Sequence, residues 1–114
     1  MNDCLFCGIV DGKVTANVVY QDESVLAFKD IRPVAPTHLL IIPRKHIASV
    51  LELTPPDDAL IGHVFRVASR LAREQGIDTS GFRVVVNTGR DAGQSVFHLH
   101  YHVLGGRPMH WPPG

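Results

Sequence analysis

The sequence predicts an α+β fold with a five-stranded antiparallel sheet, one long helix and a short N-terminal helix. Short apolar segments typical of strands occur in runs, and a single long segment with apolar residues at helical spacing lies between them. This order favours an antiparallel sheet over alternating strand–helix–strand units. The 114 residues and their apolar content of 45% suit one domain, 1–114, that buries a core without disulfide bonds.

Local patterns predict each element. Residues 4–11 suit one or two helical turns. The long helix starts after Thr54, where two prolines and two aspartates fit a first turn, and Gly76 fits its C-terminal cap. The third strand is an unbroken apolar run that Pro43 stops, which predicts burial on both faces. The expected strands are 18–20, 25–28, 38–42, 82–86 and 96–104.

Charge and hydropathy exclude several classes of function. Eleven basic and eleven acidic side chains give a net charge of zero, which argues against a broad surface for nucleic acid or anionic membranes. No segment approaches the roughly 20 apolar residues of a membrane-spanning helix. The first residues lack the features of a secretory signal, so we expect a cytoplasmic protein whose cysteines stay reduced.

Histidines carry the main functional signal. The chain has seven, and four of them follow residue 97. Because side chains alternate across a strand, the predicted strand 96–104 places His98, His100 and His102 on one face, with neighbours about 6–7 Å apart. The residues between them are expected to face the core, namely Phe97, Leu99, Tyr101 and Val103.

Three interpretations of this histidine face are open. One is a solvent-exposed polar face on which the histidines have no role, although three histidines at alternate positions rarely arise by chance. A metal site is another, but histidines about 13 Å apart at the two ends of the row cannot share one ion. Catalysis on phosphate is the third, with a neutral imidazole as nucleophile. The loop 87–95 favours catalysis, because its glycines, Gln94 and Ser95 can offer N–H groups and a hydroxyl to an anion.

Cys4 and Cys7 have the C-x-x-C spacing of half a zinc site. A redox pair has weaker support, because no strand precedes the motif as it would in a thioredoxin-like unit. Two buried cysteines without a further role also fit the pattern.

The run His-Leu-His-Tyr-His-Val-Leu at 98–104 resembles the signature of the histidine triad (HIT) nucleotide-binding family, with a tyrosine at one apolar position. The resemblance covers nearly the whole chain. It includes the segments VLAFKDI, APTHLLIIPRKHI, VVVNTG, GQSVFHLHYHVLGGR and MHWPPG. The last of these is similar to the purine nucleoside phosphoramidase branch. The resemblance implies a HIT-like fold and hydrolysis of nucleotide derivatives.

The resemblance also implies catalytic roles. His100 is expected to be the nucleophile that forms a nucleotidyl-histidine intermediate. His102 and Ser95 would contact the α-phosphate, with Ser95 also close to the leaving group. His98 would orient the triad, and His38 would lie near the leaving group. No metal is required for this scheme.

The same resemblance supplies the expected nucleotide contacts. Asp30 would accept hydrogen bonds from the ribose hydroxyls. The phosphate side would be lined by Asn87, Gly93 and Gln94, together with Ser95. The apolar slot for the purine would comprise Phe6, Ile9, Phe28, Ile31 and Leu40, with Val96 as a further nucleotide contact.

Zinc and a partner subunit are also implied by resemblance. Some bacterial members of the family bind structural zinc through such a cysteine pair and the histidines that match His46 and His98. The phosphoramidase branch often lacks this cysteine pair, so the chain combines the pair with the C-terminal segment of that branch. The family forms homodimers whose sheets join, and the tail with Trp111 would reach toward the partner's site.

These features predict a purine nucleoside phosphoramidase that cleaves the P–N bond of AMP or GMP phosphoramidates. Its expected partners are a purine nucleoside monophosphate, the corresponding phosphoramidates and a second copy of the chain. Hydrolysis of dinucleoside polyphosphates is an alternative. A nucleotide-binding sensor or partner protein with weak catalysis is another. His102 disfavours the nucleotidyl transferase branch, where glutamine is usual.

Overall fold

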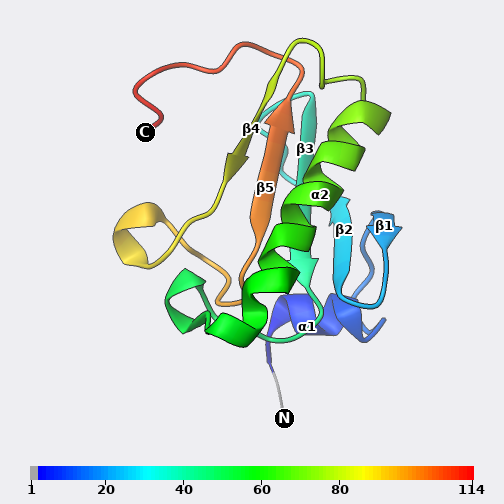
Figure 1. Ribbon diagram of the computed structural model, residues 1–114, viewed down its shortest axis with the longest axis vertical. Helices are drawn as coiled ribbons and strands as arrows, with labels where there is room; N and C mark the ends of the chain where they lie inside the picture. The colour runs from blue at the N-terminus through cyan, green and yellow to red at the C-terminus, as the bar shows by residue number, and fades with distance from the viewer. Residues whose placement is uncertain (1–2) are drawn as a thin grey trace.

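The computed structural model describes residues 3–114 and centres on an antiparallel sheet with the strand order β1-β2-β3-β5-β4 (Figure 1). This arrangement confirms the predicted α+β fold of a five-stranded antiparallel sheet with one long and one short helix. The strands are β1 (Val18–Gln21), β2 (Val25–Lys29), β3 (Thr37–Pro43), β4 (Phe82–Val85) and β5 (Tyr101–Gly105). The helices are α1 (Leu5–Val10) and α2 (Asp58–Glu74). Within residues 3–114, no helix is long and apolar enough to cross a membrane.

The central strand β3 separates two apolar cores. Leu39 and Ile41 belong to the cluster that includes the buried face of α2, whereas Leu40 and Ile42 pack with Phe6 of α1. All four β3 side chains are buried, which confirms the prediction from the unbroken apolar run. The long helix therefore covers one face of the sheet and leaves the α1 face for a ligand pocket.

The helix α2 begins at Asp58, one turn after the predicted N-cap Thr54. A 3-10 turn, Pro55–Asp57, precedes it, and the Asp57 carboxylate accepts hydrogen bonds from the backbone N–H and hydroxyl of Thr54 at 3.0 and 3.1 Å. Gly76 follows the helix with φ of +72°, a conformation that glycine adopts at little cost. These caps define the ends of the one long helix in the described chain.

The predicted strand 96–104 is wrong at its start, because β5 begins only at Tyr101. His98 and His100 therefore lie in the connection before the strand. Pro43 has no N–H with which to extend the sheet ladder. Its carbonyl accepts a hydrogen bond from His98 Nε2 at 2.8 Å, so a side chain bonds there in place of a strand backbone. Phe97 does not face the core as expected and is 61% exposed, since the alternation of a strand does not extend to this connection.

Candidate active site

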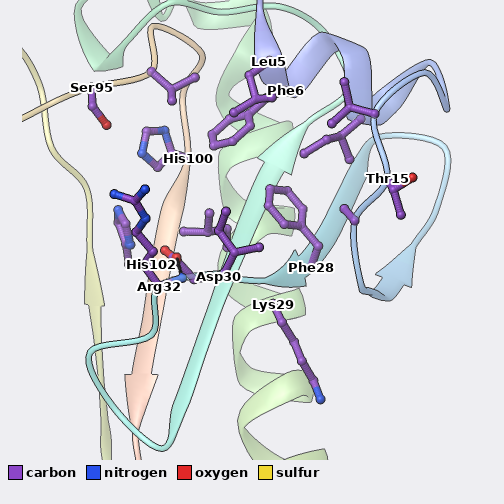
Figure 2. Close-up of a pocket in the computed structure, with 16 residues that line it drawn as sticks. Leu5, Phe6, Thr15, Phe28, Lys29, Asp30, Arg32, Ser95, His100 and His102 are labelled. Carbon is purple, nitrogen blue, oxygen red and sulfur yellow. Dashed lines mark hydrogen bonds between the residues drawn. The ribbon is translucent and has the colours of Figure 1, made fainter.

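A pocket of about 370 Å³ opens on the α1 face of the sheet (Figure 2). We call the part formed by Phe6, Ile9, Phe28 and Leu40 its apolar end, and the part formed by Ser95, His100 and His102 its histidine end. The structure brings ten of the predicted nucleotide-contacting residues to the pocket wall: Phe6, Ile9, Phe28, Asp30, Ile31, Leu40, Ser95, Val96, His100 and His102. Ile31 is 90% exposed, so it lies at the rim instead of inside the slot.

Six lining residues were not predicted from the sequence, namely Leu5, Val14, Thr15, Ala16, Lys29 and Arg32. The segment after α1 reaches the pocket because it folds back on the helix, with the N–H groups of Lys13 and Val14 both donating to the carbonyl of Gly8. A Cβ on Gly8 would lie 2.7 Å from a methyl of Val14. A glycine inside an otherwise apolar helix was thus a signal of this close approach.

The loop before β5 is held by Gln94, whose side chain is buried. Its Nε2 donates to the carbonyls of Ala48 and Val96 at 2.8 and 3.1 Å, and its Oε1 accepts from the N–H of Gly89 at 2.9 Å. Gln94 therefore shapes the loop and does not line the pocket. The two other residues expected on the phosphate side, Asn87 and Gly93, also lie outside the pocket wall.

His100 presents one unprotonated ring nitrogen. Its Nδ1 lies 2.7 Å from the carbonyl oxygen of His98, which can only accept, so Nδ1 carries the proton. The Nε2 lone pair is then available, and the ring lines the pocket beside Phe6, at 5.1 Å between ring centroids. A neutral imidazole with a defined free nitrogen is suited to nucleophilic attack.

His38, His102 and Asp30 form a second hydrogen-bonded group. The N–H of Val34 donates to His38 Nδ1 at 3.1 Å, so the His38 proton is on Nε2. That Nε2 lies 2.9 Å from His102 Nδ1 and 3.3 Å from Asp30 Oδ2. His102 consequently accepts at Nδ1 and keeps an Nε2–H as a donor. These three residues are close enough to share an ion, but the His38 proton occupies the position a metal would need.

Burial keeps both of these histidines neutral. Desolvation lowers the pKa of His102 to about 4, and the nearby His100 and His38 add to this effect. Desolvation also lowers the pKa of His38, although the charge of Asp30 opposes the shift. The histidine end of the pocket therefore offers neutral N–H donors at pH 7.

This neutrality predicts a pH-dependent stability. The pKa of His102 is about 4 in the folded state against 6.5 for an ordinary histidine, so this stability is present above pH 6.5 and is lost as the pH falls toward 4. His102→Gln removes the titrating group. Between pH 7 and pH 5, we expect the free energy of unfolding of this variant to decrease by about 1 kcal/mol less than that of the wild type. Urea unfolding at both pH values measures the difference. An equal drop in the two proteins would contradict it.

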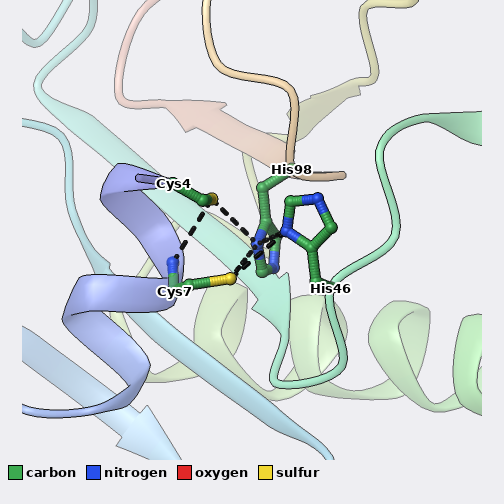
Figure 3. A group of neighbouring side chains, drawn as sticks. All are labelled: Cys4, Cys7, His46 and His98. Carbon is green, nitrogen blue, oxygen red and sulfur yellow. Dashed lines mark hydrogen bonds between the residues drawn. The ribbon is translucent and has the colours of Figure 1, made fainter. Parts of the chain in front are cut away.

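Cys4, Cys7, His46 and His98 meet at the start of α1 (Figure 3). Their potential ligand atoms all lie within 4.8 Å of one another. Cys7 Sγ is 3.2 Å from His46 Nδ1 and 3.5 Å from His98 Nδ1, and the two Nδ1 atoms are 3.2 Å apart. His98 is fully buried, whereas His46 is exposed. The structure thus brings together all four residues of the predicted metal set.

This donor set fits zinc. Zn–S and Zn–N bonds of ordinary length place tetrahedral ligand atoms about 3.3–3.8 Å apart, close to the observed separations. The Nε2 of His98 lies 2.8 Å from the carbonyl of Pro43, so it carries the proton and leaves the Nδ1 lone pair toward the cysteines. Bound zinc would supply a structural cross-link there. The other triad histidines face the pocket and are not part of this group.

Comparisons with known proteins agree with this architecture. The sequence model of the HIT domain matches residues 11–109. An uncharacterized HIT-like protein of Synechocystis sp. is 47% identical over 112 residues, which span 98% of this chain and 97% of that protein. The crystal structure of a HIT family hydrolase from Legionella pneumophila Philadelphia 1 is 49% identical, with a TM-score of 0.97 over 98% of this chain and 100% of that one. A Zn-bound histidine triad family protein from Mycobacterium smegmatis is 37% identical, with a TM-score of 0.79 over 92% of this chain and 76% of that one. The chain belongs to the HIT domain family.

Proposed function

We propose that this protein is a hydrolase that cleaves the P–N bond of AMP or GMP phosphoramidates through a nucleotidyl-histidine intermediate. The observation that carries the proposal is the free Nε2 of His100 in the pocket wall, defined by the Nδ1–H bond to the His98 carbonyl. The similarity to a protein named as a HIT family hydrolase supports hydrolysis in general. The phosphoramidase resemblance of the C-terminal segment supports the P–N bond as the target.

The reaction proceeds in two displacements. His100 Nε2 forms a bond to phosphorus as the P–N bond to the amine breaks, and the amine departs with a proton donated from the site. The modified ring carries positive charge, which the His98 carbonyl at Nδ1 stabilises. Water then attacks phosphorus opposite the P–Nε2 bond, which breaks, and a proton from this water restores the donor of the site. AMP or GMP departs and His100 Nε2 is regenerated. Splitting one displacement into two lowers each barrier.

The remaining pocket residues position the nucleotide. The Nε2–H of His102 can donate to the α-phosphate, since its Nδ1 is occupied by His38. Asp30 Oδ1 accepts the backbone N–H of Arg32 at 2.8 Å, and its second oxygen can accept from a ribose hydroxyl. The aromatic rings of Phe6 and Phe28, 5.5 Å apart, form an apolar slot for a purine.

A substrate comparison tests this function. AMP release from adenosine 5′-phosphoramidate and from a dinucleoside polyphosphate is followed under the same conditions in chelator. We expect turnover of the phosphoramidate with the larger kcat/KM. A larger kcat/KM for the polyphosphate would favour the alternative hydrolase. Tight AMP binding with no release from either substrate would identify a nucleotide-binding sensor.

We also propose a homodimer joined through β4. This strand is an edge of the sheet and carries Phe82, which is 38% exposed, and the C-terminal segment after β5 carries Trp111, which is 82% exposed. Pairing two such edges would cover unpaired backbone groups and apolar side chains. Sedimentation at micromolar concentration is expected to give the mass of two chains. A monomer would refute the dimer.

A further inference from the structure

We propose that Arg32 recognises an anionic group on the leaving half of the substrate. The enzyme then prefers nucleotides whose departing group carries a carboxylate or a phosphate. This inference rests on the proposed function, because it requires the nucleotide to bind with its phosphate at the histidine end of the pocket.

The first support is the position of Arg32. Its side chain lines the same pocket as His100 and His102, and its backbone is tied to Asp30 by the N–H bond at 2.8 Å. Figure 2 draws the guanidinium near His102, on the side of the view opposite Thr15. A nucleotide with its base against Phe6 and Phe28 at the apolar end would therefore place its phosphate at the histidine end, beside Arg32.

The second support is that the guanidinium has no ion pair or hydrogen bond to a protein group in the described part of the chain, 3–114. The acid nearest in sequence, Asp30, uses Oδ1 for the backbone of Arg32 and places Oδ2 3.3 Å from His38 Nε2. An arginine offers five donors in a planar fork that matches a carboxylate or phosphate. Arg32 is therefore available for a ligand.

The third support is the charge of the surroundings. Burial keeps His38 and His102 neutral at pH 7, so neither supplies a permanent positive charge to a second anionic group. Lys29 is the other cation of the pocket wall, but Figure 2 shows its ammonium directed away from the histidines. Arg32 is thus the permanent cation on the leaving-group side of the described pocket.

The kinetic test uses two adenosine phosphoramidates of one amine, with a carboxylate or with the corresponding neutral amide on the amine. For wild type, we expect kcat/KM to be roughly fivefold higher for the carboxylate, as an exposed charged hydrogen bond predicts. Arg32→Gln is expected to abolish this preference, with a larger loss of kcat/KM for the carboxylate substrate than for the neutral one. Lys29→Gln is the matched control and is expected to keep the preference.

The binding test uses AMP and ADP, and calorimetry gives the dissociation constants without turnover. Wild type and Lys29→Gln are expected to gain affinity from the second phosphate, and Arg32→Gln is expected to lose that gain, with a larger loss of affinity for ADP than for AMP. An equal loss for both ligands, or no preference in wild type, would overturn the role of Arg32. Normal binding differences with no cleavage of either phosphoramidate would refute the proposed function and leave Arg32 as the anion-binding residue.

Discussion

His100→Ala is expected to lower kcat for AMP release from adenosine 5′-phosphoramidate by at least about a thousandfold, the size expected for removal of a covalent nucleophile. The reason is specific to this ring. Its Nδ1–H is bound to the His98 carbonyl at 2.7 Å, so its Nε2 is the free nucleophilic nitrogen, whereas the Nδ1 of His102 is engaged by His38 at 2.9 Å. No neighbouring histidine can take over the attack without changing its hydrogen bonds.

The variant needs a check that its pocket remains intact. Phe6 loses one ring contact to His100, but Phe28, Leu40 and Asp30 keep their neighbours, so AMP affinity measured by calorimetry is expected to change only a few-fold. His102→Gln is an informative comparison, because it replaces this imidazole with an amide that can still donate and it keeps the nucleophile. We expect it to retain much more activity than His100→Ala. If His100→Ala retained a tenth of the wild-type kcat, nucleophilic catalysis by this residue would be excluded.

Loss of zinc is expected to have the second largest effect, on stability. Zinc present at a thousand times its dissociation constant contributes about 4 kcal/mol to the free energy of unfolding. For a domain of this size, that corresponds to a decrease in Tm of roughly 15 °C on chelation. The positions of the ligands explain the size of this effect on stability. Cys4 and His98 are 94 positions apart, so zinc would tie the short helix α1 to the connection before β5.

The measurements for zinc are metal analysis of the purified protein and thermal unfolding with and without chelator. The control is the double variant Cys4→Ser, Cys7→Ser, which is expected to have the lower Tm already and to show no further response to chelator. Wild-type protein that contains no zinc after expression in zinc-supplemented medium would contradict the metal site. An unchanged Tm on removal of bound zinc would contradict its structural role.

Much of the fold was predictable because its signals are local. The helix α2 has a helical apolar stripe between Thr54 and Gly76, and β3 has an unbroken apolar run. The error at β5 has a non-local cause. The side chain of His98 bonds to the carbonyl of Pro43, and the N–H of Leu99 donates to the carbonyl of Ile47 at 2.6 Å, so separate contacts and not a ladder hold the segment.

The candidate site was predictable where the family motif specifies a residue, as for the pocket position of Asp30 and the gathering of the cysteine pair with His46. Tertiary contacts determined the rest. The buried side chain of Gln94 faces its own loop, and the exposed side chain of Arg32 reaches the pocket. Neither orientation has a periodic signal in the sequence.

The contact between the β1–β2 turn and α2 is another feature that the sequence does not predict. His63 carried no assignment from the sequence, yet its Nε2 lies 2.6 Å from Asp22, which also accepts from Tyr20 at 2.7 Å. Burial alone would raise the pKa of Asp22, but hydrogen bonds from His63, Tyr20 and two backbone N–H groups hold it well below its usual range. Local sequence patterns do not indicate this pairing, because 41 positions separate His63 from Asp22.

Direct trapping of the intermediate tests whether the nucleotide becomes covalently attached to His100. Wild-type protein is mixed with adenosine 5′-phosphoramidate, quenched at alkaline pH within milliseconds, digested and analysed by mass spectrometry. We expect one adenylyl group per chain on the peptide that contains 98–104, located on His100, before AMP release reaches its steady rate. An adenylyl group on a different residue, or steady AMP release with no adduct at any time, would contradict it.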